Sequence, residues 1–203
     1  MNTTTTNQVF TGSLSDINQK YSCIYADPCW AYNDAYSRGA AINHYNTMAI
    51  EDIAALPVKD IAADDSVLFL WVTFPHLQSC FKVIEDWGFK YTTIGFNWFK
   101  TYPKNKDKFF VGLGNWTRAN SELCLMAKRG HPQRVDNCVE SIIKSPIGRH
   151  SEKPQCVKKH IVELLGDVPR IELFARTSTP GWSAWGNEVT TRGLTELTLD
   201  NFV

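Results

Sequence analysis

Apolar residues along the chain gather in two kinds of segment, short β-rich runs and longer stretches with helical spacing. Runs rich in β-branched and aromatic residues are typical of buried strands, and they occur at residues 21–26, 66–72, 91–99, 121–127 and 170–175. Helical spacing predicts helices at residues 50–56, 76–87 and 154–165, of which the last ends before Gly166. Because strands alternate with helices, we predict an α/β fold with a largely parallel sheet covered by helices on both faces. Functional side chains are then expected just after strands, where the ligand crevice of such a sheet opens.

The apolar pattern weakens at both ends of the chain. Residues 1–14 are rich in Thr and Asn with little to bury, and we predict a flexible N-terminus there, followed by one domain at residues 15–189 and a peripheral tail at residues 190–203. Two long segments interrupt the alternation, at residues 31–46 and 101–120. Loops of this length in a compact domain usually close over a ligand or form a binding surface.

Composition narrows the function classes. The 21 basic and 21 acidic residues give a formal net charge of zero, so attraction to a nucleic acid has to come from local basic patches. The six cysteines form no Cys-x-x-Cys pair and the five histidines show no metal-ligand spacing, which predicts neither a zinc site nor disulfides. No apolar run approaches the ~18 residues of a membrane span, and the N-terminus does not have the pattern of a secretion signal. We expect a soluble protein of a reducing cytoplasm, that of a bacterium or a phage-infected host.

The run Asp27-Pro28-Cys29-Trp30 follows the first predicted strand, where the crevice opens. The exocyclic amine of adenine conjugates its lone pair into the ring, so an enzyme that methylates it needs acceptors for the amine hydrogens while the lone pair faces a methyl donor. The Asp27 carboxylate and the Pro28 carbonyl would supply two acceptors, and Trp30 a face on which the base stacks. A strand-ending Asp-Pro turn with a core tryptophan explains the tetrapeptide equally well.

Further motifs follow the tetrapeptide in order: SVLFLWV, GFNWFK, GNWTRANSELCLMAKRGHPQ, RHSEKPQ, and RIELFAR with a downstream GW and WGNE. Together they resemble the MT-A-seventy-like adenine N6-methyltransferases, the family of the messenger-RNA adenosine methyltransferase catalytic subunit and its compact bacterial and phage relatives, over residues 20–188. The resemblance implies a Rossmann-like methyltransferase fold with permuted motif order and S-adenosyl-L-methionine as cofactor. Cys29 departs from the second proline that is usual in the family. The absence of a G-x-G-x-x-G motif argues against a dinucleotide-binding dehydrogenase.

The resemblance also implies a set of cofactor-binding residues. Lys153 would hold the carboxylate of the methionine moiety, beside the start of the predicted helix 154–165. Ribose and neighbouring contacts would come from Asp27, Glu172, Arg176, Asn187 and Glu188, and contacts with the cofactor adenine from Asp16 and Ile17. Taken singly, Lys153 is also explained as a solvated first-turn residue of a helix capped by Ser151. Glu172 is likewise explained as a surface residue of an edge strand, and Asn187 as a turn residue.

Aromatic and basic side chains near the predicted crevice are candidates for substrate contact. Tyr45 lies in the run HYNTM, which resembles a family segment that closes over the base, and a structural role for this tyrosine is equally open. The other candidates are Trp98, Lys100, Lys104, Lys106, Lys108 and Arg118, with Trp116 nearby. A second basic group consists of Lys128, Arg129 and Arg134. A lysine-rich loop is often only a solvated surface, but both groups adjoin predicted segments of the crevice, which favours phosphate contact.

These observations favour an enzyme that uses S-adenosyl-L-methionine to methylate the N6 amine of adenine in DNA. We predict DNA in place of RNA because the chain is short, carries no zinc finger or RNA-binding module, and resembles the compact bacterial and phage members of the family. The alternatives are an RNA N6-adenosine methyltransferase, a non-catalytic nucleic-acid-binding subunit of the same fold, and an enzyme for another exocyclic amine such as cytosine N4.

Overall fold

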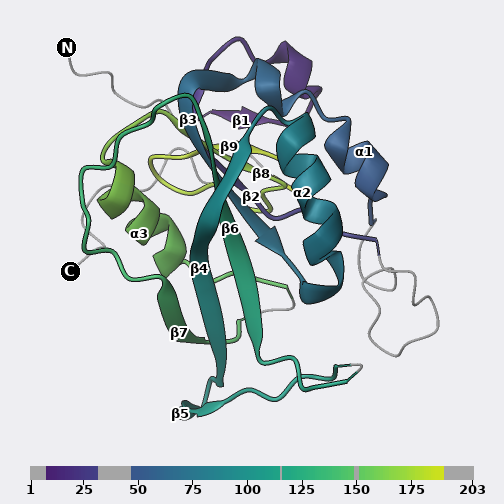
Figure 1. Cartoon of the computed structure of the whole chain (residues 1–203), viewed down its shortest axis with the longest axis vertical. Coiled ribbons are helices and arrows are strands. Elements are labelled where there is room, and N and C mark those ends of the chain that lie inside the picture. Colours follow the sequence, from purple (N-terminus) through teal and green to yellow (C-terminus); the bar gives the residue numbers. More distant parts are fainter. Residues whose placement is uncertain (1–7, 32–46, 115, 149–150, 190–203) are drawn as a thin grey trace.

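A computed structural model describes residues 8–31, 47–114, 116–148 and 151–189 of the chain (Figure 1). These residues form a nine-stranded sheet with the strand order β1-β9-β8-β2-β3-β6-β4-β5, in which β7 pairs with β4 outside this path. The strands are β1 (Val9–Phe10), β2 (Tyr21–Ala26), β3 (Ala62–Val72), β4 (Lys90–Tyr102), β5 (Asn105–Phe109), β6 (Ser121–Arg129), β7 (Ile142–Pro146), β8 (Arg170–Leu173) and β9 (Ser183–Trp185).

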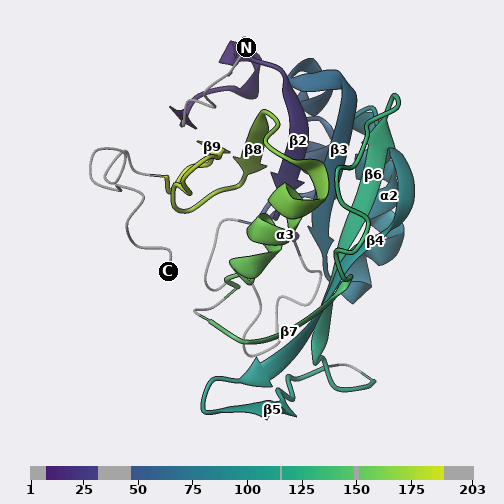
Figure 2. The same ribbon diagram turned by 90° about the vertical axis from the view of Figure 1, so that its left-hand side faces the viewer.

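Helices cover both faces of the sheet (Figures 1 and 2). On one face lie α1 (Ile50–Ala54) and α2 (Leu77–Asp86), and on the other lies α3 (Cys156–Leu165). Short 3-10 turns are formed by Leu14–Asp16, Val58–Asp60 and Phe74–His76. Helix α3 ends as predicted at Gly166, whose φ of 76° is readily adopted only by glycine.

Two buried clusters, one on each face, hold the helices against the sheet. Successive side chains of a strand point to opposite faces, so Ile24 and Leu68 pack with α2 residues such as Val83, whereas Tyr25 and Phe69 pack with the α3 side. Each fully buried aliphatic or aromatic side chain of this kind contributes roughly 1.5–3 kcal/mol. The central strands β2 and β3 are therefore fixed from both sides, and so is the position of any residue that follows them directly.

The predicted α/β, Rossmann-like architecture is confirmed, and each of the five predicted strands and three predicted helices is present at its place. The sheet is mixed, however, because β6 runs antiparallel to both β3 and β4. Four short strands were not predicted: β1, β5, β7 and β9. Residues 101–120 are accordingly not a simple loop, since β4 extends to Tyr102 and β5 folds back on it. Within the segment predicted to be a flexible N-terminus, Val9–Phe10 pair with β9.

The direction of β6 decides which basic residues lie near the predicted crevice. Strands β2, β3, β4 and β8 all run the same way, so their carboxyl ends share one edge of the sheet. Because β6 is reversed, it begins at that edge with Ser121 and ends at the opposite edge with Arg129, which contacts the Lys59 carbonyl. The prediction that Lys128, Arg129 and Arg134 adjoin the crevice is therefore wrong.

Helix length and composition also bear on membranes. Among the described residues, no helix is both long and apolar enough to cross a membrane.

All six cysteines are free thiols, and of these Cys138 alone is exposed.

Candidate active site

Asp27 lies directly after β2, at the edge where the parallel strands end. Its carboxylate is one quarter exposed, and Oδ2 accepts a hydrogen bond of 2.8 Å from the ammonium group of Lys153. Lys153 precedes α3 and is 126 residues away in sequence. The fold thus joins the residue predicted to accept the adenine amine to the residue predicted to bind the cofactor carboxylate.

The turn that follows Asp27 is held by main-chain hydrogen bonds. The Pro28 carbonyl accepts the N–H of Trp30 at 3.0 Å, the N–H of Met48 donates to the Cys29 carbonyl at 2.9 Å, and that of Ala31 donates to the Met48 carbonyl at 3.1 Å. The main chain of Met48 therefore holds the turn that contains Cys29, although the second proline usual in the family is absent. A carbonyl oxygen has two lone pairs, so Pro28 can accept one further hydrogen bond.

The two tryptophans predicted to contact the substrate belong to the core. Trp30 is 4% exposed, donates its indole N–H to the Trp71 carbonyl and stacks on His76 with the ring centroids 5.7 Å apart. Trp98 is 3% exposed and donates its indole N–H to the Ser145 carbonyl. Both side chains are buried and both indole N–H groups have an acceptor, as is usual for a core tryptophan. The predictions that Trp30 offers a stacking face and that Trp98 contacts substrate are therefore corrected: the two residues support the site from the core.

Four charged side chains form a continuous network at this edge. Besides its bond to Asp27, the Lys153 ammonium lies 3.5 Å from Oε2 of Glu122, near the start of β6. The other oxygen of Glu122 accepts a hydrogen bond from Lys100 of β4. Lys153, Lys100 and Glu122 are 11%, 15% and 20% exposed. Lys100 is thus an internal ion-pair partner, which corrects the prediction that it contacts a phosphate.

Burial and neighbouring charges shift the pKa values in this network. Burial raises the pKa of Asp27, and the attraction of Lys153 offsets this only in part. Burial acts in the same direction on Glu122, but the charges of Lys153 and Lys100 hold the pKa of this carboxyl below its ordinary value. For Lys153, burial lowers the pKa, and Asp27 and Glu122 outweigh it, so the pKa is raised. At neutral pH Glu122 and Lys153 are charged, and the charge on Asp27 is the least stabilised.

A second buried ion pair lies further along the same face. Glu172 of β8 accepts a hydrogen bond from Lys158 of α3 at 2.5 Å, and Lys158 also donates to the Thr179 hydroxyl at 2.8 Å. Burial raises the pKa of Glu172, with Lys158 opposing it. Glu172 is 15% exposed and β8 lies between β2 and β9, which excludes the interpretation of Glu172 as an edge-strand surface residue. Lys158 was not predicted, although a single lysine beside Val157 on the buried side of a helix indicates a charged partner.

The remaining predicted cofactor residues form two groups, one after β8 and β9 and one before β2. Arg176 follows β8, and its positive charge acts on both Cys29 and Asp27. Asn187 and Glu188 are exposed and follow Gly186, whose N–H donates to the Phe10 carbonyl. Between β1 and β2, Asp16 is exposed, whereas the Ile17 side chain is buried in the core with Leu14. Tyr45 lies outside the described residues.

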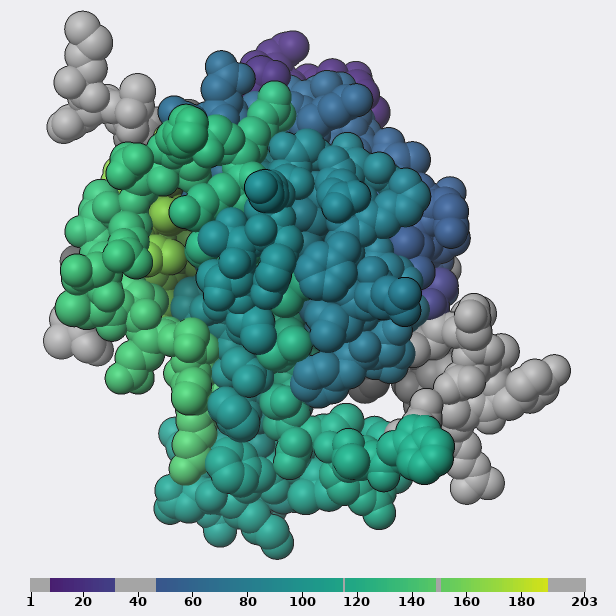
Figure 3. Space-filling view, viewed as in Figure 1, coloured from purple at the N-terminus to yellow at the C-terminus, as the bar shows by residue number. Residues whose placement is uncertain are grey.

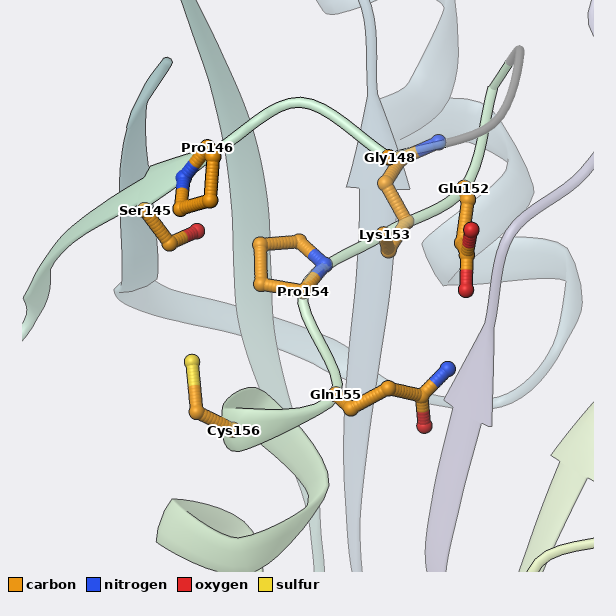
Figure 4. A pocket seen from close by; sticks show the side chains of 8 residues that line it. All are labelled: Ser145, Pro146, Gly148, Glu152, Lys153, Pro154, Gln155 and Cys156. Atoms are coloured by element: carbon orange, nitrogen blue, oxygen red, sulfur yellow. The ribbon is translucent and has the colours of Figure 1, made fainter. Parts of the chain in front are cut away.

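A pocket of about 250 Å³ opens beside Lys153, between the end of β7 and the start of α3 (Figure 4). It is lined by Ser145, Pro146, Gly148, Glu152, Lys153, Pro154, Gln155 and Cys156. Lys153 is one of these lining residues, and a lysine ammonium is suited to binding a carboxylate. Within the described ranges, no three His, Cys, Asp or Glu side chains lie close enough together to hold a metal ion.

Residues 101–114 and 116–120, called the arm below, project from this edge beyond the helices (Figures 1 and 2). Lys104, Lys106, Lys108 and Arg118 are all exposed there, and the Lys108 ammonium lies 5.8 Å from the ring centroid of Tyr102. Trp116 is fully exposed. The arm therefore places exposed cations and an accessible aromatic ring on the site side of the sheet.

Comparisons with known proteins identify relatives that match most of the chain. The family model described as MT-A70 matches residues 21–188. The chain is 33% identical over 192 residues to the Type II methyltransferase M.MunI of Mycoplasma sp, covering 84% of this chain and 78% of that protein. It is 27% identical over 193 residues to the N(6)-adenine-specific methyltransferase METTL4 of Mus musculus, which covers 87% of this chain and 39% of the relative. With the N(6)-adenosine-methyltransferase catalytic subunit METTL3 of Homo sapiens the identity is 25% over 173 residues, 84% of this chain and 28% of the relative.

Proposed function

Because the chain belongs to the MT-A70 family of S-adenosylmethionine-dependent N6-adenine methyltransferases, we propose that it methylates the N6 amine of adenine in DNA. The observation that carries the proposal is the acceptor pair of Asp27 and the Pro28 carbonyl, held at the sheet edge beside Lys153. DNA is favoured because the chain is 33% identical to the Type II methyltransferase and 25% identical to the human N(6)-adenosine-methyltransferase subunit. The catalytic unit is the domain at residues 15–189, to which β1 adds an edge strand.

In this proposal Asp27 and Pro28 orient the amine. The Asp27 carboxylate accepts one N–H of the amine and the second lone pair of the Pro28 carbonyl accepts the other, which turns the nitrogen lone pair away from the turn. As positive charge develops on the nitrogen, the carboxylate stabilises it more strongly than it stabilises the ground state. When bound, the sulfonium cofactor supplies an electrophilic methyl group.

The donor set at the edge fits such a cofactor. Lys153, beside the pocket before α3, is suited to the carboxylate of the methionine moiety. We assign hydroxyl and neighbouring contacts to Glu172 in β8 and to the polar residues after β2, β8 and β9, and a contact with the adenine ring to the segment before β2. These residues are Asp27, Glu172, Arg176, Asn187, Glu188, Asp16 and Ile17, the last through its main chain.

Nucleic-acid contact is assigned to the arm. The chain has no net charge, so phosphate attraction depends on local groups such as the exposed Lys104, Lys106 and Lys108. Figure 3 shows the arm projecting below the body of the molecule, where it is accessible to a large ligand. Arg118 joins these lysines, and Tyr45 stays a predicted contact. We place the reaction in the cytoplasm, because free cysteines are typical of a reducing compartment.

The proposal is tested by incubating the protein with labelled S-adenosylmethionine and matched DNA and RNA oligonucleotides, then digesting the products to nucleosides. We expect N6-methyladenine from DNA, and none with Asp27→Ala. Asp86→Ala, which removes an exposed carboxylate of α2 far from the site, is the control and should retain full activity. Methylated RNA alone, or N4-methylcytosine, would contradict the substrate assignment. If the protein also fails to bind S-adenosylmethionine in calorimetry, the non-catalytic alternative holds.

A further inference from the structure

The four-residue ion network raises a problem for the chemistry proposed above. Lys153 already donates to Asp27 Oδ2 at 2.8 Å, so its ammonium group offsets the negative charge that should stabilise the amine as that group becomes positive. Asp27 is therefore a stronger acceptor for the substrate when Lys153 moves away from it. A buried ammonium that loses its carboxylate partner is strongly destabilised, and Lys153 is only 11% exposed.

Glu122 offers Lys153 a second carboxylate at a small displacement. Its Oε2 lies 3.5 Å from the same Lys153 nitrogen that bonds to Asp27. Lys100 binds the other oxygen, Oε1, and so fixes the direction in which Oε2 points. The neutral walls on this side are aromatic: the Lys153 nitrogen lies 5.6 Å from the ring centroid of Trp71, and the Lys100 nitrogen 5.2 Å from that of Trp98.

The four side chains come from four separate elements whose positions are independently fixed. Asp27 follows β2, Lys100 is in β4, Glu122 is in β6, and Lys153 precedes α3. The register pairs Trp98 with Glu122 across the antiparallel β4–β6 ladder, and the indole of Trp98 is anchored on the Ser145 carbonyl of β7. Lys100 and Glu122 are therefore built into the sheet, and Asp27 and Lys153 meet them from the segments that adjoin β2 and α3.

We infer that Glu122, oriented by Lys100, is a positioning residue for methyl transfer: it retains the Lys153 ammonium when that group moves away from Asp27, and so leaves the negative charge of Asp27 to the adenine amine. The inference rests on the proposed function and assigns a role to two residues that touch neither the amine nor the methyl donor. The low pKa of Glu122 agrees with it, since a carboxylate with this role has to stay charged.

The test compares Glu122→Gln with the native chain. The amide keeps the size of the side chain but removes its charge, so Lys153 has Asp27 as its one remaining carboxylate partner among the described residues and holds it more tightly. We expect kcat to fall by about 10- to 100-fold, as is usual when a reacting group is misplaced. Calorimetry should show weaker binding of S-adenosylhomocysteine, because Lys153 no longer has a second position near the pocket. Glu122→Asp should recover part of both.

A pH profile adds a readout that a purely structural role would not change. The charged groups that face Lys153 directly are Asp27 and Glu122. Two more act indirectly: Lys100 acts on Glu122, and Arg176 acts on Asp27. Removing the Glu122 charge lowers the pKa of Lys153, since that carboxylate helps to raise it. The loss of S-adenosylhomocysteine affinity at alkaline pH should therefore begin at a lower pH in Glu122→Gln than in the native protein.

A double variant separates positioning from stability. In Glu122→Gln the Lys100 ammonium is left without its carboxylate, so the thermal midpoint should fall. Lys100→Met/Glu122→Gln removes that unpaired cation, and we expect it to recover stability without recovering kcat. Lys82→Met, which breaks an exposed ion pair on α2, is the matched control and should change neither.

Two results would overturn the inference: native kcat and S-adenosylhomocysteine affinity in Glu122→Gln, or recovery of kcat together with stability in the double variant. Failure of the proposed function gives a different pattern, because the native protein itself would then transfer no methyl group to adenine. In that case the S-adenosylhomocysteine affinities and their pH dependence still decide whether Glu122 positions Lys153.

Discussion

Asp27 combines a functional position with an unfavourable charge. Burial raises its pKa above the ordinary value of 3.8, so the folded protein binds the proton more tightly than the unfolded chain does. Such a group contributes most to stability when protonated, and the contribution is lost as the pH rises through the folded pKa. We therefore predict that Asp27→Asn abolishes at least about 99% of methyl transfer yet is as stable as the native protein at neutral pH, or more so.

Urea unfolding of both proteins from about pH 4 to pH 7 checks this prediction. The difference in unfolding free energy, variant minus native, should grow with pH across that window, because the variant has no carboxyl to ionise at position 27. Lys153 keeps Glu122 as its partner in the variant, so no cation is left alone. A variant that is less stable than the native protein at pH 7 by as much as at pH 4 would contradict the argument.

Lys158 illustrates the opposite case, a buried cation needed for stability. Lys158→Met leaves Glu172 beside Tyr25 without its ammonium partner, and we expect a loss of about 1–3 kcal/mol at neutral pH. The loss should shrink in acid, where Glu172 is protonated in both proteins. Urea unfolding at pH 7 and pH 4 measures it, with Lys82→Met on the exposed face of α2 as a control that leaves the midpoint unchanged. An equal loss at both pH values would indicate a packing effect instead.

At the scale of elements, the sequence predicted those segments whose own apolar pattern specifies them. Strand β2 matches its predicted bounds, and α2 and α3 were predicted to within about two residues at each end. The missed strands depend on their neighbours: β5 is wholly exposed, and β1 and β9 are only two and three residues long. No local periodicity distinguishes such strands from loops, because their hydrogen bonds come from partners distant in sequence.

The same limit applies to the site. The sequence predicted that Asp27 follows a strand and that Lys153 precedes a helix. It did not predict that Lys153 contacts Asp27, or that Lys153 contacts Glu122. The contact of Lys153 with Glu122 depends on the reversed direction of β6, which brings the start of that strand to the carboxyl ends of its neighbours. Burial likewise could not be read for Trp30 and Trp98, since a tryptophan near a motif looks the same whether it faces a ligand or the core.

The arm carries a prediction of its own as an element. Replacing Lys104, Lys106 and Lys108 by Gln should weaken DNA binding and reduce the slope of log K against log salt by up to about 2.7, at about 0.9 for each phosphate that a lysine no longer neutralises. Fluorescence anisotropy with an oligonucleotide over a range of salt concentrations measures both. A charge-matched control is the triple Gln variant at Lys90, Lys128 and Arg134, on or near the opposite edge of the sheet, which should leave the slope unchanged. Equal effects of the two variants would show that general charge, and not the arm, binds DNA.

At the scale of the whole molecule, the sheet separates stability from chemistry. Two apolar clusters fix the central strands from both faces, whereas the charged residues gather where these strands end. Three ion pairs lie there at low exposure: Lys100–Glu122, Lys153–Asp27 and Lys158–Glu172. Because removing charges from water costs about as much as pairing them gains, the apolar core stabilises this arrangement more than the ion pairs do. Ligands that complete the network should therefore stabilise the entire fold, because the edge residues come from β2, β4, β6, β8 and α3 together.

The stabilisation by a bound ligand can be measured as a shift in thermal unfolding. A ligand that binds only the folded state raises the unfolding free energy by RT ln(1 + [L]/Kd), about 2.7 kcal/mol at 100-fold excess over Kd, which corresponds to roughly 5–10 °C in the thermal midpoint of a domain of this size. We predict a shift of this order with S-adenosylhomocysteine in the native protein. Lys153→Met should lose most of the shift, because the methionine carboxylate then has no ammonium partner, whereas Lys82→Met, on an exposed face, should retain it. A full shift in Lys153→Met would show that the carboxylate is held elsewhere, and would remove Lys153 from the cofactor site while leaving its pairing with Asp27 intact.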